Sequence, residues 1–259
     1  MNYFIKCIQL FIYKLKKEKF SGEILFSELV DKLKSRDNIY RYMHHYFIHK
    51  FPNILVEHRN YFKKDKRGYG EDAFHAMWFK IFEEYRPSCA LEIGVYRGQV
   101  ITLWGMLAKI NKIECKIFGL SPFSAAGDDV SKYLKDIDYI GDIKYSCNYF
   151  NLDNIELVRH LSTDRGAISF IKSNRWDLIY IDGSHDYEDA LSDYEVSKDS
   201  LVVGGILVID DSSLFTDYKP PKFSFKGHPG PSRIVTEHAM NEMKFICGVG
   251  HNNVFQKIS

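Results

Sequence analysis

The sequence predicts an α/β protein with a mostly parallel sheet covered by helices on both faces, preceded by an N-terminal helical extension. From Cys89 onward, short apolar runs alternate with helical stretches, a pattern typical of a parallel sheet. Before that point the apolar residues recur at helical spacing. We therefore divide the chain into a helical extension at 1–85 and an α/β domain at 86–259, which includes a lid-like loop at 214–235.

The composition is that of an ordinary folded protein of 259 residues, with 45% hydrophobic and 27% charged residues. A formal net charge of +1 gives no field that would attract nucleic acid, so we expect no nucleic-acid partner. The five cysteines are odd in number and lack CxxC spacing. This usage predicts reduced thiols in the cytoplasm, rather than disulfides or a zinc site.

The first predicted element is a short helix from Phe4 to Tyr13, followed by several lysines. It is too short to span a bilayer, and it lacks the cleavage site of a signal peptide. Two roles stay open for it: packing on its own domain or on a partner chain, or peripheral contact with a membrane surface. Further helices are predicted up to Pro87, with a basic loop from Phe62 to Gly70 between them.

Strands and helices alternate through the α/β domain, and the chain is expected to end in a pair of strands. The strands are predicted at Ala90–Ile93, Lys116–Leu120, Ile155–His160, Leu178–Ile181 and Gly205–Ile209. The helices are predicted around Gln99–Ile110, Asp129–Phe150, Arg165–Lys172 and Tyr187–Ser200. The segment 214–235 is rich in Pro, Gly and Lys, which favours a loop over the substrate.

Ligands of such sheets bind beyond the carboxyl ends of the strands, so the residues that follow each strand are the candidate site. After the first strand, Glu92, Gly94 and Gly98 form an E-x-G-x-x-x-G pattern. Glycines let the backbone approach a ligand, and the helix that follows would direct its first N–H groups at it; tight packing is the alternative explanation. A nicotinamide site would need G-x-G-x-x-G, and Tyr96 stands in place of the middle glycine.

Three carboxylates follow the fourth and fifth strands: Asp182 after one, and Asp210 and Asp211 after the other. If these strands are neighbours, the acids converge and repel one another unless a cation is present. Hard oxygen ligands of this kind suit Mg²⁺, with Mn²⁺ or Ca²⁺ as alternatives. Capping of the following helices is the competing explanation, and we favour the metal because three acids gather at two strand ends.

Three segments together, ALEIGVYRG, DLIYIDGSHDYEDALSDYEV and LVVGGILVIDD, resemble class I S-adenosylmethionine-dependent methyltransferases. The nearest resemblance is to metal-dependent sugar O-methyltransferases of the macrocin and mycinamicin type, and a more distant one is to catechol O-methyltransferase. It covers Ala90 to Ser213 and implies a Rossmann-like class I methyltransferase fold with a mostly parallel seven-stranded sheet. It also implies S-adenosylmethionine and Mg²⁺ as cofactors, with the metal held by the three aspartates.

The resemblance implies cofactor contacts at the ends of the strands. Ser121 stands where the family places an acid that binds the ribose hydroxyls, and Asp128 or Asp129 is an alternative partner for them. Ser162 falls where the family borders the adenine, although capping of the next helix also explains it. The cofactor-binding residues predicted in this way are Glu92, Gly94, Gly98, Ser121, Ser162 and Asp182.

His185 is the predicted catalytic residue, because its position three residues beyond the first metal acid carries the general base in the resembled enzymes. A metal ion would lower the pKa of a substrate hydroxyl, and a neighbouring imidazole can accept the proton near neutral pH. A solvated, paired surface histidine is the alternative explanation. Weaker candidates are His228 and Arg233 on the lid-like loop, a phosphate site at Lys63–Arg67, and Tyr69, Glu71 and Trp78.

We therefore predict a methyl transfer from S-adenosylmethionine to a hydroxyl, most naturally a vicinal diol on a sugar or a glycosylated small molecule. One alternative is an oxidoreductase related to cephalosporin hydroxylases, which the same sheet and metal site resemble. Another is a non-catalytic cofactor-binding protein that docks on a membrane or partner through its N-terminal helix. By analogy with the resembled enzymes, the chain is also expected to form a homo-oligomer.

Overall fold

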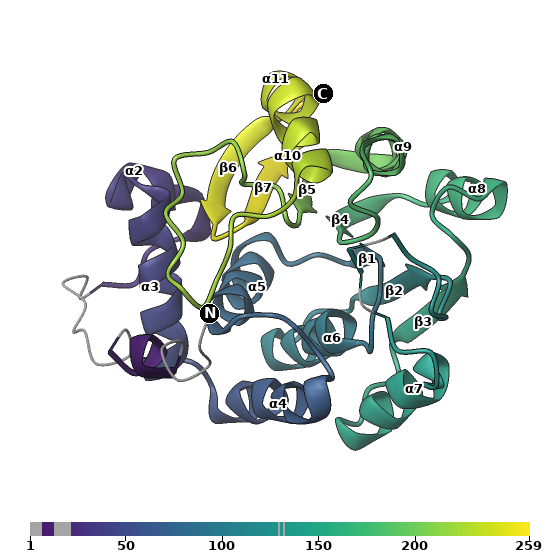
Figure 1. Ribbon diagram of the computed structural model, residues 1–259, viewed down its shortest axis with the longest axis horizontal. Coiled ribbons are helices and arrows are strands. Elements are labelled where there is room, and N and C mark those ends of the chain that lie inside the picture. The colour runs from purple at the N-terminus through teal and green to yellow at the C-terminus, as the bar shows by residue number, and fades with distance from the viewer. Residues whose placement is uncertain (1–6, 13–21, 129, 132) are drawn as a thin grey trace.

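The computed structural model describes residues 7–12, 22–128, 130–131 and 133–259. Its seven-stranded sheet has the order β3-β2-β1-β4-β5-β7-β6, in which β1 to β5 are parallel and β7 is antiparallel to both of its neighbours. The mostly parallel seven-stranded sheet predicted from the sequence is thus confirmed (Figure 1). The strands are β1 (Cys89–Ile93), β2 (Lys116–Ser121), β3 (Ile155–Arg159), β4 (Trp176–Ile181), β5 (Leu201–Ile209), β6 (Lys244–Val249) and β7 (Asn252–Gln256).

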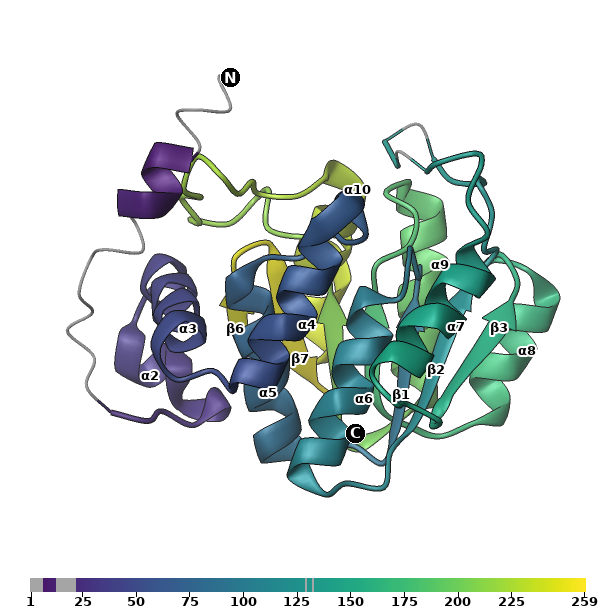
Figure 2. The ribbon, with the colours of Figure 1, turned by 90° about the horizontal axis from the view of Figure 1, so that it is seen from below.

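Helices cover both faces of the sheet (Figure 2). On one face lie α4 (Asn53–Lys63), α5 (Asp72–Tyr85), α6 (Gln99–Asn111) and α7 (Tyr139–Tyr149). On the other face lie α8 (Arg165–Ser173), α9 (Tyr187–Ser200) and α10 (Pro229–Ile234). Further helices are α2 (Leu29–Leu33), α3 (Arg36–His49) and α11 (Met240–Glu242), with 3-10 turns at Phe26–Glu28 and Lys64–Lys66 and a π-helical turn at Val235–Ala239.

The N-terminal extension and the sheet share one hydrophobic core. Trp78 of α5 packs edge-on against Trp104 of α6, with ring centroids 5.0 Å apart, and against Tyr180 of β4 at 4.9 Å. All three side chains are at most 5% exposed, so each ring removes a large apolar area from water. The helix α5 therefore forms part of the wall behind the carboxyl ends of the strands.

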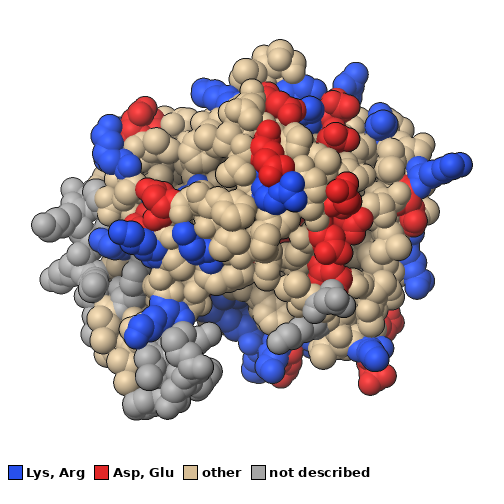
Figure 3. All heavy atoms as spheres, turned by 45° about the horizontal axis from the view of Figure 1, so that its top comes forward, with Lys and Arg blue, Asp and Glu red and all other residues tan. Residues whose placement is uncertain are grey.

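Of the helix predicted at Phe4–Tyr13, residues 7–12 are helical and the rest lies outside the described residues. Within the described part of the chain, no helix combines the length and apolar character needed to cross a membrane. Acidic and basic side chains lie close to one another on the face shown in Figure 3, in keeping with the near-zero net charge.

One predicted helix begins later than expected. The helix assigned to Asp129–Phe150 begins at Tyr139, where the Asp138 carboxylate accepts a hydrogen bond from the Gly141 N–H at 2.9 Å and caps it. Upstream, the Asp128 carboxylate accepts from the backbone N–H groups of Val130 and Ser131, which makes a turn in place of a helix. The lid-like loop also differs from the prediction, because it ends in a helix from Pro229 onward.

Candidate active site

A cavity of about 390 Å³ opens at the carboxyl ends of β1, β4 and β5. Its size is in the range of small-molecule binding sites. The helix α5 and the loop before it form one wall, and the segment after β5 forms another. Residues predicted from the sequence as cofactor, metal or catalytic groups line this cavity: Glu92, Gly94, Asp182, His185, Asp210 and Asp211.

Gly94 allows the end of β1 to lie directly against the backbone at the end of β4. Its φ is +97°, and a Cβ at this position would overlap the backbone carbonyl of Asp182, so glycine is required there. The Asp182 N–H in turn donates to the Ile93 carbonyl at 2.8 Å. Gly98, with φ +84°, is the N-cap of α6. The glycines of the E-x-G-x-x-x-G pattern therefore set both the strand contact and the start of the helix.

Glu92 is a buried acid in this cavity. Its side chain is 3% exposed, and one carboxyl oxygen, Oε2, has no hydrogen-bond partner. Burial raises the pKa of Glu92 to about 8, so the group is mostly protonated at neutral pH. A buried polar atom without a partner is costly, which makes this oxygen available to a bound ligand.

The three aspartates meet as predicted from the parallel topology. Ile181 of β4 pairs with Ile209 of β5, so Asp182 and Asp210 follow in register and their carboxyl groups lie within hydrogen-bonding distance. Burial and the charges of Asp210 and Asp211 raise the pKa of Asp182 well above its usual value. Burial and the charge of Asp211 likewise raise the pKa of Asp210. Mutual repulsion of this kind is relieved by a cation.

His185 lies between two carboxylates. Its Nδ1 is 2.7 Å from Asp128 Oδ2, and its Nε2 is 3.1 Å from Asp211 Oδ2. The backbone N–H of His185 also donates to Asp128. Burial alone would lower the pKa of His185, but the hydrogen bonds to Asp211 and Asp128 raise it to about 9. Asp128 therefore serves as the partner that orients the His185 ring, and Asp129 lies outside the described residues.

Two further histidines join the site. His228, on the segment after β5, places Nε2 3.7 Å from Asp211 Oδ2, and the sequence marked it as a weaker candidate. His251, in the turn between β6 and β7, hydrogen-bonds Asp211 Oδ1 through Nδ1. No pattern in the sequence marks His251, because only the antiparallel return of β7 beside β5 brings that turn to the acids.

Within the described residues, two three-membered groups hold ligand atoms that all lie within 4.8 Å of one another. One consists of Asp210, Asp211 and His251, and the other of His185, Asp211 and His228. Asp182 joins the first group through its contact with Asp210. Asp210 Oδ1 is buried without a hydrogen-bond partner, so an acceptor faces the middle of this group. Carboxylate and imidazole donors in this arrangement fit a divalent cation.

Three of the residues predicted to contact the cofactor, one from the glycine turn and two for its nucleoside end, lie outside the lining of this cavity. Among the described residues that line the cavity, Gly98, Ser121 and Ser162 do not occur. Ser121 ends β2 and is 4% exposed. Ser162 follows β3, and its hydroxyl donates to the Asp193 carboxylate at 3.1 Å.

The weaker candidates of the sequence divide into two kinds. Tyr69, Glu71 and Trp78 line the cavity, from α5 and the loop before it. The charged candidates are paired with acids: Lys63 with Asp72 at 2.7 Å, Arg67 with Asp142 at 2.9 Å, and Arg233 with Glu237 at 2.8 Å. Lys63 and Arg67, at the two ends of the predicted phosphate site, are thus each paired with a carboxylate.

In the comparison with protein families, residues 91–212 match the family described as a methyltransferase domain. Among curated proteins, an uncharacterized protein of Acanthamoeba polyphaga mimivirus, R132, is 24% identical over 151 residues. That match spans 57% of this chain and 59% of the viral protein, so the chain covers less than two thirds of that relative.

Solved structures share the fold. An O-methyltransferase from Bacillus cereus in complex with SAH has a TM-score of 0.57 at 13% identity, covering 86% of this chain and 100% of that one. SAH-bound methyltransferase PaMTH1 of Podospora anserina has a TM-score of 0.54 at 14% identity, covering 81% and 89%. The O-methyltransferase NovP has a TM-score of 0.54 at 12% identity, covering 74% and 84%. The chain thus has the Rossmann-like fold of these methyltransferases.

Proposed function

We propose, from the methyltransferase domain match at 91–212 and this fold, that the protein transfers a methyl group from S-adenosylmethionine to a hydroxyl of a sugar or a glycosylated small molecule. The observation that carries the proposal is the meeting of Gly94, three aspartates and His185 in one cavity at the carboxyl ends of β1, β4 and β5. Open sheets of this class bind their ligands at that edge.

The cofactor is proposed to enter at the end of β1. The Gly94 turn brings the backbone of β1 against that of Asp182, and Glu92 offers an unpartnered oxygen in the cavity. The amino end of α6, which begins after Gly98, would contribute backbone N–H groups and a positive dipole end. Ser121 and Ser162, at the ends of the next two strands, remain the proposed contacts for the ribose and the adenine.

A divalent cation, Mg²⁺ or Mn²⁺, is proposed to bind Asp182, Asp210 and Asp211. When bound, it would act as a Lewis acid that lowers the pKa of the substrate hydroxyl. The residues present fit such an ion, because Asp182 and Asp210 hold raised pKa values and Asp210 Oδ1 lacks a hydrogen-bond partner. Two neighbouring hydroxyls could bind together beside these acids, which favours a vicinal diol as the acceptor.

His185 is proposed to accept the proton of the substrate hydroxyl. Asp128 holds the ring through Nδ1–H and through the His185 backbone, which leaves Nε2 directed toward Asp211. Without a cation, the hydrogen bond to the Asp211 carboxylate is one of the contacts that raise the pKa of His185. A cation on Asp211 would neutralise that charge, so Nε2 could take up the hydroxyl proton as a general base.

The decisive experiment measures S-adenosylmethionine binding by calorimetry and formation of S-adenosylhomocysteine with a panel of sugar and glycoside acceptors. We expect binding, turnover that exhaustive chelation removes, and a loss of about 10²-fold or more in turnover in His185→Ala. The exposed His160, which lies 3.6 Å from Asp164, supplies the control variant His160→Ala. Absence of binding at millimolar S-adenosylmethionine would contradict the proposal, and undiminished turnover after chelation would exclude the metal.

A further inference from the structure

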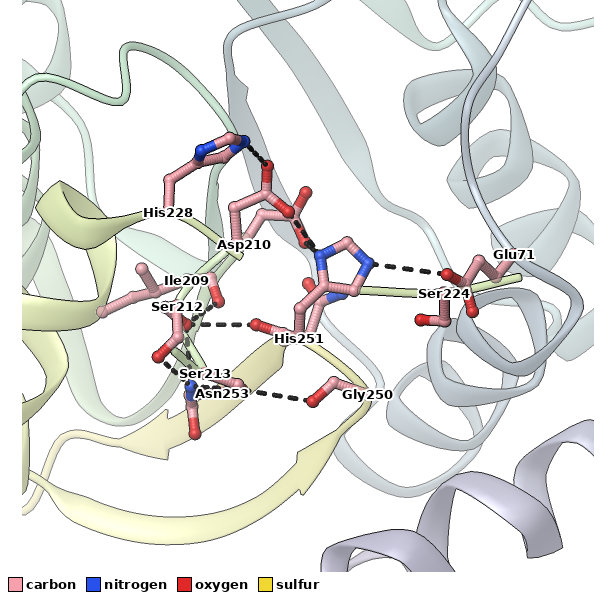
Figure 4. A network of polar contacts seen from close by, with 12 residues as sticks. Glu71, Ile209, Asp210, Ser212, Ser213, Ser224, His228, Gly250, His251 and Asn253 are labelled. Atoms are coloured by element: carbon pink, nitrogen blue, oxygen red, sulfur yellow. Dashed lines mark hydrogen bonds and ion pairs between the residues drawn. The ribbon is translucent and has the colours of Figure 1, made fainter. Parts of the chain in front are cut away.

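His251 faces the acidic centre with one ring nitrogen (Figure 4). Its Nδ1 hydrogen-bonds Asp211 Oδ1 and lies 3.6 Å from Asp210 Oδ1. The ring is 6% exposed and stands in the turn that joins β6 to β7. The turn is fixed by backbone pairing, because the Ser212 N–H donates to the His251 carbonyl at 2.9 Å. The position of the imidazole beside the two acids is therefore built into the sheet.

The other ring nitrogen faces a carboxylate of the N-terminal extension. His251 Nε2 is buried without a hydrogen-bond partner, and it lies 3.9 Å from Glu71 Oε1. Glu71 is itself held by the Tyr40 hydroxyl and by Ser224. Metal-bound histidines characteristically direct their second ring nitrogen at a carboxylate, which fixes the tautomer and the ring orientation. His251 is placed in the same way: Nδ1 faces Asp210 and Asp211, and Nε2 faces the Glu71 carboxylate.

A charged imidazole that only neutralises the two aspartates would explain part of this geometry. It would not explain Asp210 Oδ1, which is buried, lies toward His251 Nδ1 and has no hydrogen-bond partner. Buried acceptors without a partner usually mark an ion or a water that completes the site. The ligand atoms of Asp210, Asp211 and His251 are also mutually close enough to share one ion.

We propose that His251 is a ligand of the metal centre through Nδ1, oriented by Glu71, and that the centre therefore selects a transition-metal ion such as Mn²⁺ over Mg²⁺. Mg²⁺ prefers oxygen donors and keeps several waters, whereas an imidazole ligand favours divalent transition-metal ions. The inference rests on the proposed metal dependence and specifies which ion the site takes. It also gives the N-terminal extension a role in the centre, because Glu71 lies on the loop before α5.

The test is titration of the metal-free full-length protein with Mn²⁺ and with Mg²⁺ in separate calorimetry experiments. We expect Mn²⁺ to bind at least about tenfold more tightly than Mg²⁺, and His251→Gln to reduce that ratio to about threefold or less. His160→Gln, an exposed histidine, is the matched control and should leave the ratio unchanged. Equal affinities in the wild type, or an unchanged ratio in His251→Gln, would overturn the assignment.

A second measurement does not depend on the folding of a buried variant. Pulsed electron paramagnetic resonance of Mn²⁺ on the wild-type protein should show ¹⁴N coupling from a coordinated imidazole. Glu71→Gln should keep this coupling and weaken Mn²⁺ binding about tenfold or more, as expected for loss of an outer carboxylate. Absence of coupling, or coupling that survives in His251→Gln, would refute His251 as the ligand. Neither readout needs S-adenosylmethionine, so failure of the methyl transfer would be seen separately.

Discussion

Arg36 offers a direct test of how the N-terminal extension supports the site. This residue of α3 donates from Nη1 to Ser213 Oγ at 2.8 Å, to the Gly250 carbonyl at 3.1 Å and to the Asn252 carbonyl at 3.2 Å. Its Nη2 donates to the Asn253 side chain. One guanidinium therefore joins α3 to the segment after Asp211 and to the turn that carries His251. We expect Arg36→Met to loosen both.

The size of the effect follows from the number and kind of bonds. Hydrogen bonds from a charged donor contribute more than neutral ones, but burial lowers the pKa of Arg36, which shows that removing its hydration is costly. Counting somewhat under 1 kcal/mol for each of the bonds after that cost gives a loss of about 3 kcal/mol in the free energy of unfolding. For a chain of this length that corresponds to a fall in Tm of roughly 6–12 °C.

Urea unfolding followed by fluorescence, together with thermal unfolding, would measure the change. Arg86 supplies a matched control, because it also donates to backbone carbonyls, those of Asn111 and Lys112, but at an exposed position. Arg86→Met should cost no more than about 0.5 kcal/mol. If Arg36→Met lost less than about 1 kcal/mol, or no more than the Arg86 variant, the cross-link would not hold the site together.

Two further predictions concern the sheet edge. Gly94→Ala should lower S-adenosylmethionine affinity more than tenfold, because its Cβ would overlap the Asp182 carbonyl. Gly204 is the control: it shares the positive φ, but a Cβ there would meet no described atom within 4 Å. Gly204→Ala should therefore cost only about 1–2 kcal/mol in the free energy of unfolding. Burial raises the pKa of Asp193 to about 7, above its value near 4 in the unfolded chain, so the stability it gives is complete below pH 4 and is lost as pH rises through 7. Asp193→Asn should therefore show a flatter profile of unfolding free energy between pH 4 and 8, and parallel profiles would contradict the buried carboxyl.

The sequence predicts those site residues whose positions are determined by the parallel strands that they follow. A strand that ends in an acid places it at the carboxyl edge, and neighbouring strands place their acids together, as Asp182 and Asp210 show. The role of Gly94 can likewise be predicted from the sequence, because a strand–helix turn after an acid requires a residue that adopts positive φ. These features depend on local pattern and on one topological rule.

The part that the sequence does not predict depends on contacts between distant segments. His251 reaches the acids only because β7 runs antiparallel to β5, and Glu71 reaches His251 only because α5 packs against the sheet. The helix assigned from Asp129 was wrong over its first turns, because the Asp128 carboxylate bonds nearby backbone groups and His185. Side chains that compete with the helix for backbone N–H groups are hard to recognise before their partners are known.

Asp211 contacts residues from several separate parts of the chain, and its backbone conformation determines these contacts. Its φ is +49°, a conformation that costs a non-glycine residue about 1 kcal/mol or more and is found where surrounding structure enforces it. The enforcing contacts come from the segment after β5: the His228 N–H donates to the Asp211 carbonyl at 2.7 Å, and only a glycine fits beside it at position 227. With the backbone so held, one carboxylate oxygen faces His251 and the other faces His185 and His228. The lid-like segment therefore determines where the two oxygens of Asp211 point, so changes in that segment should alter the proposed metal binding as well as access to the cavity.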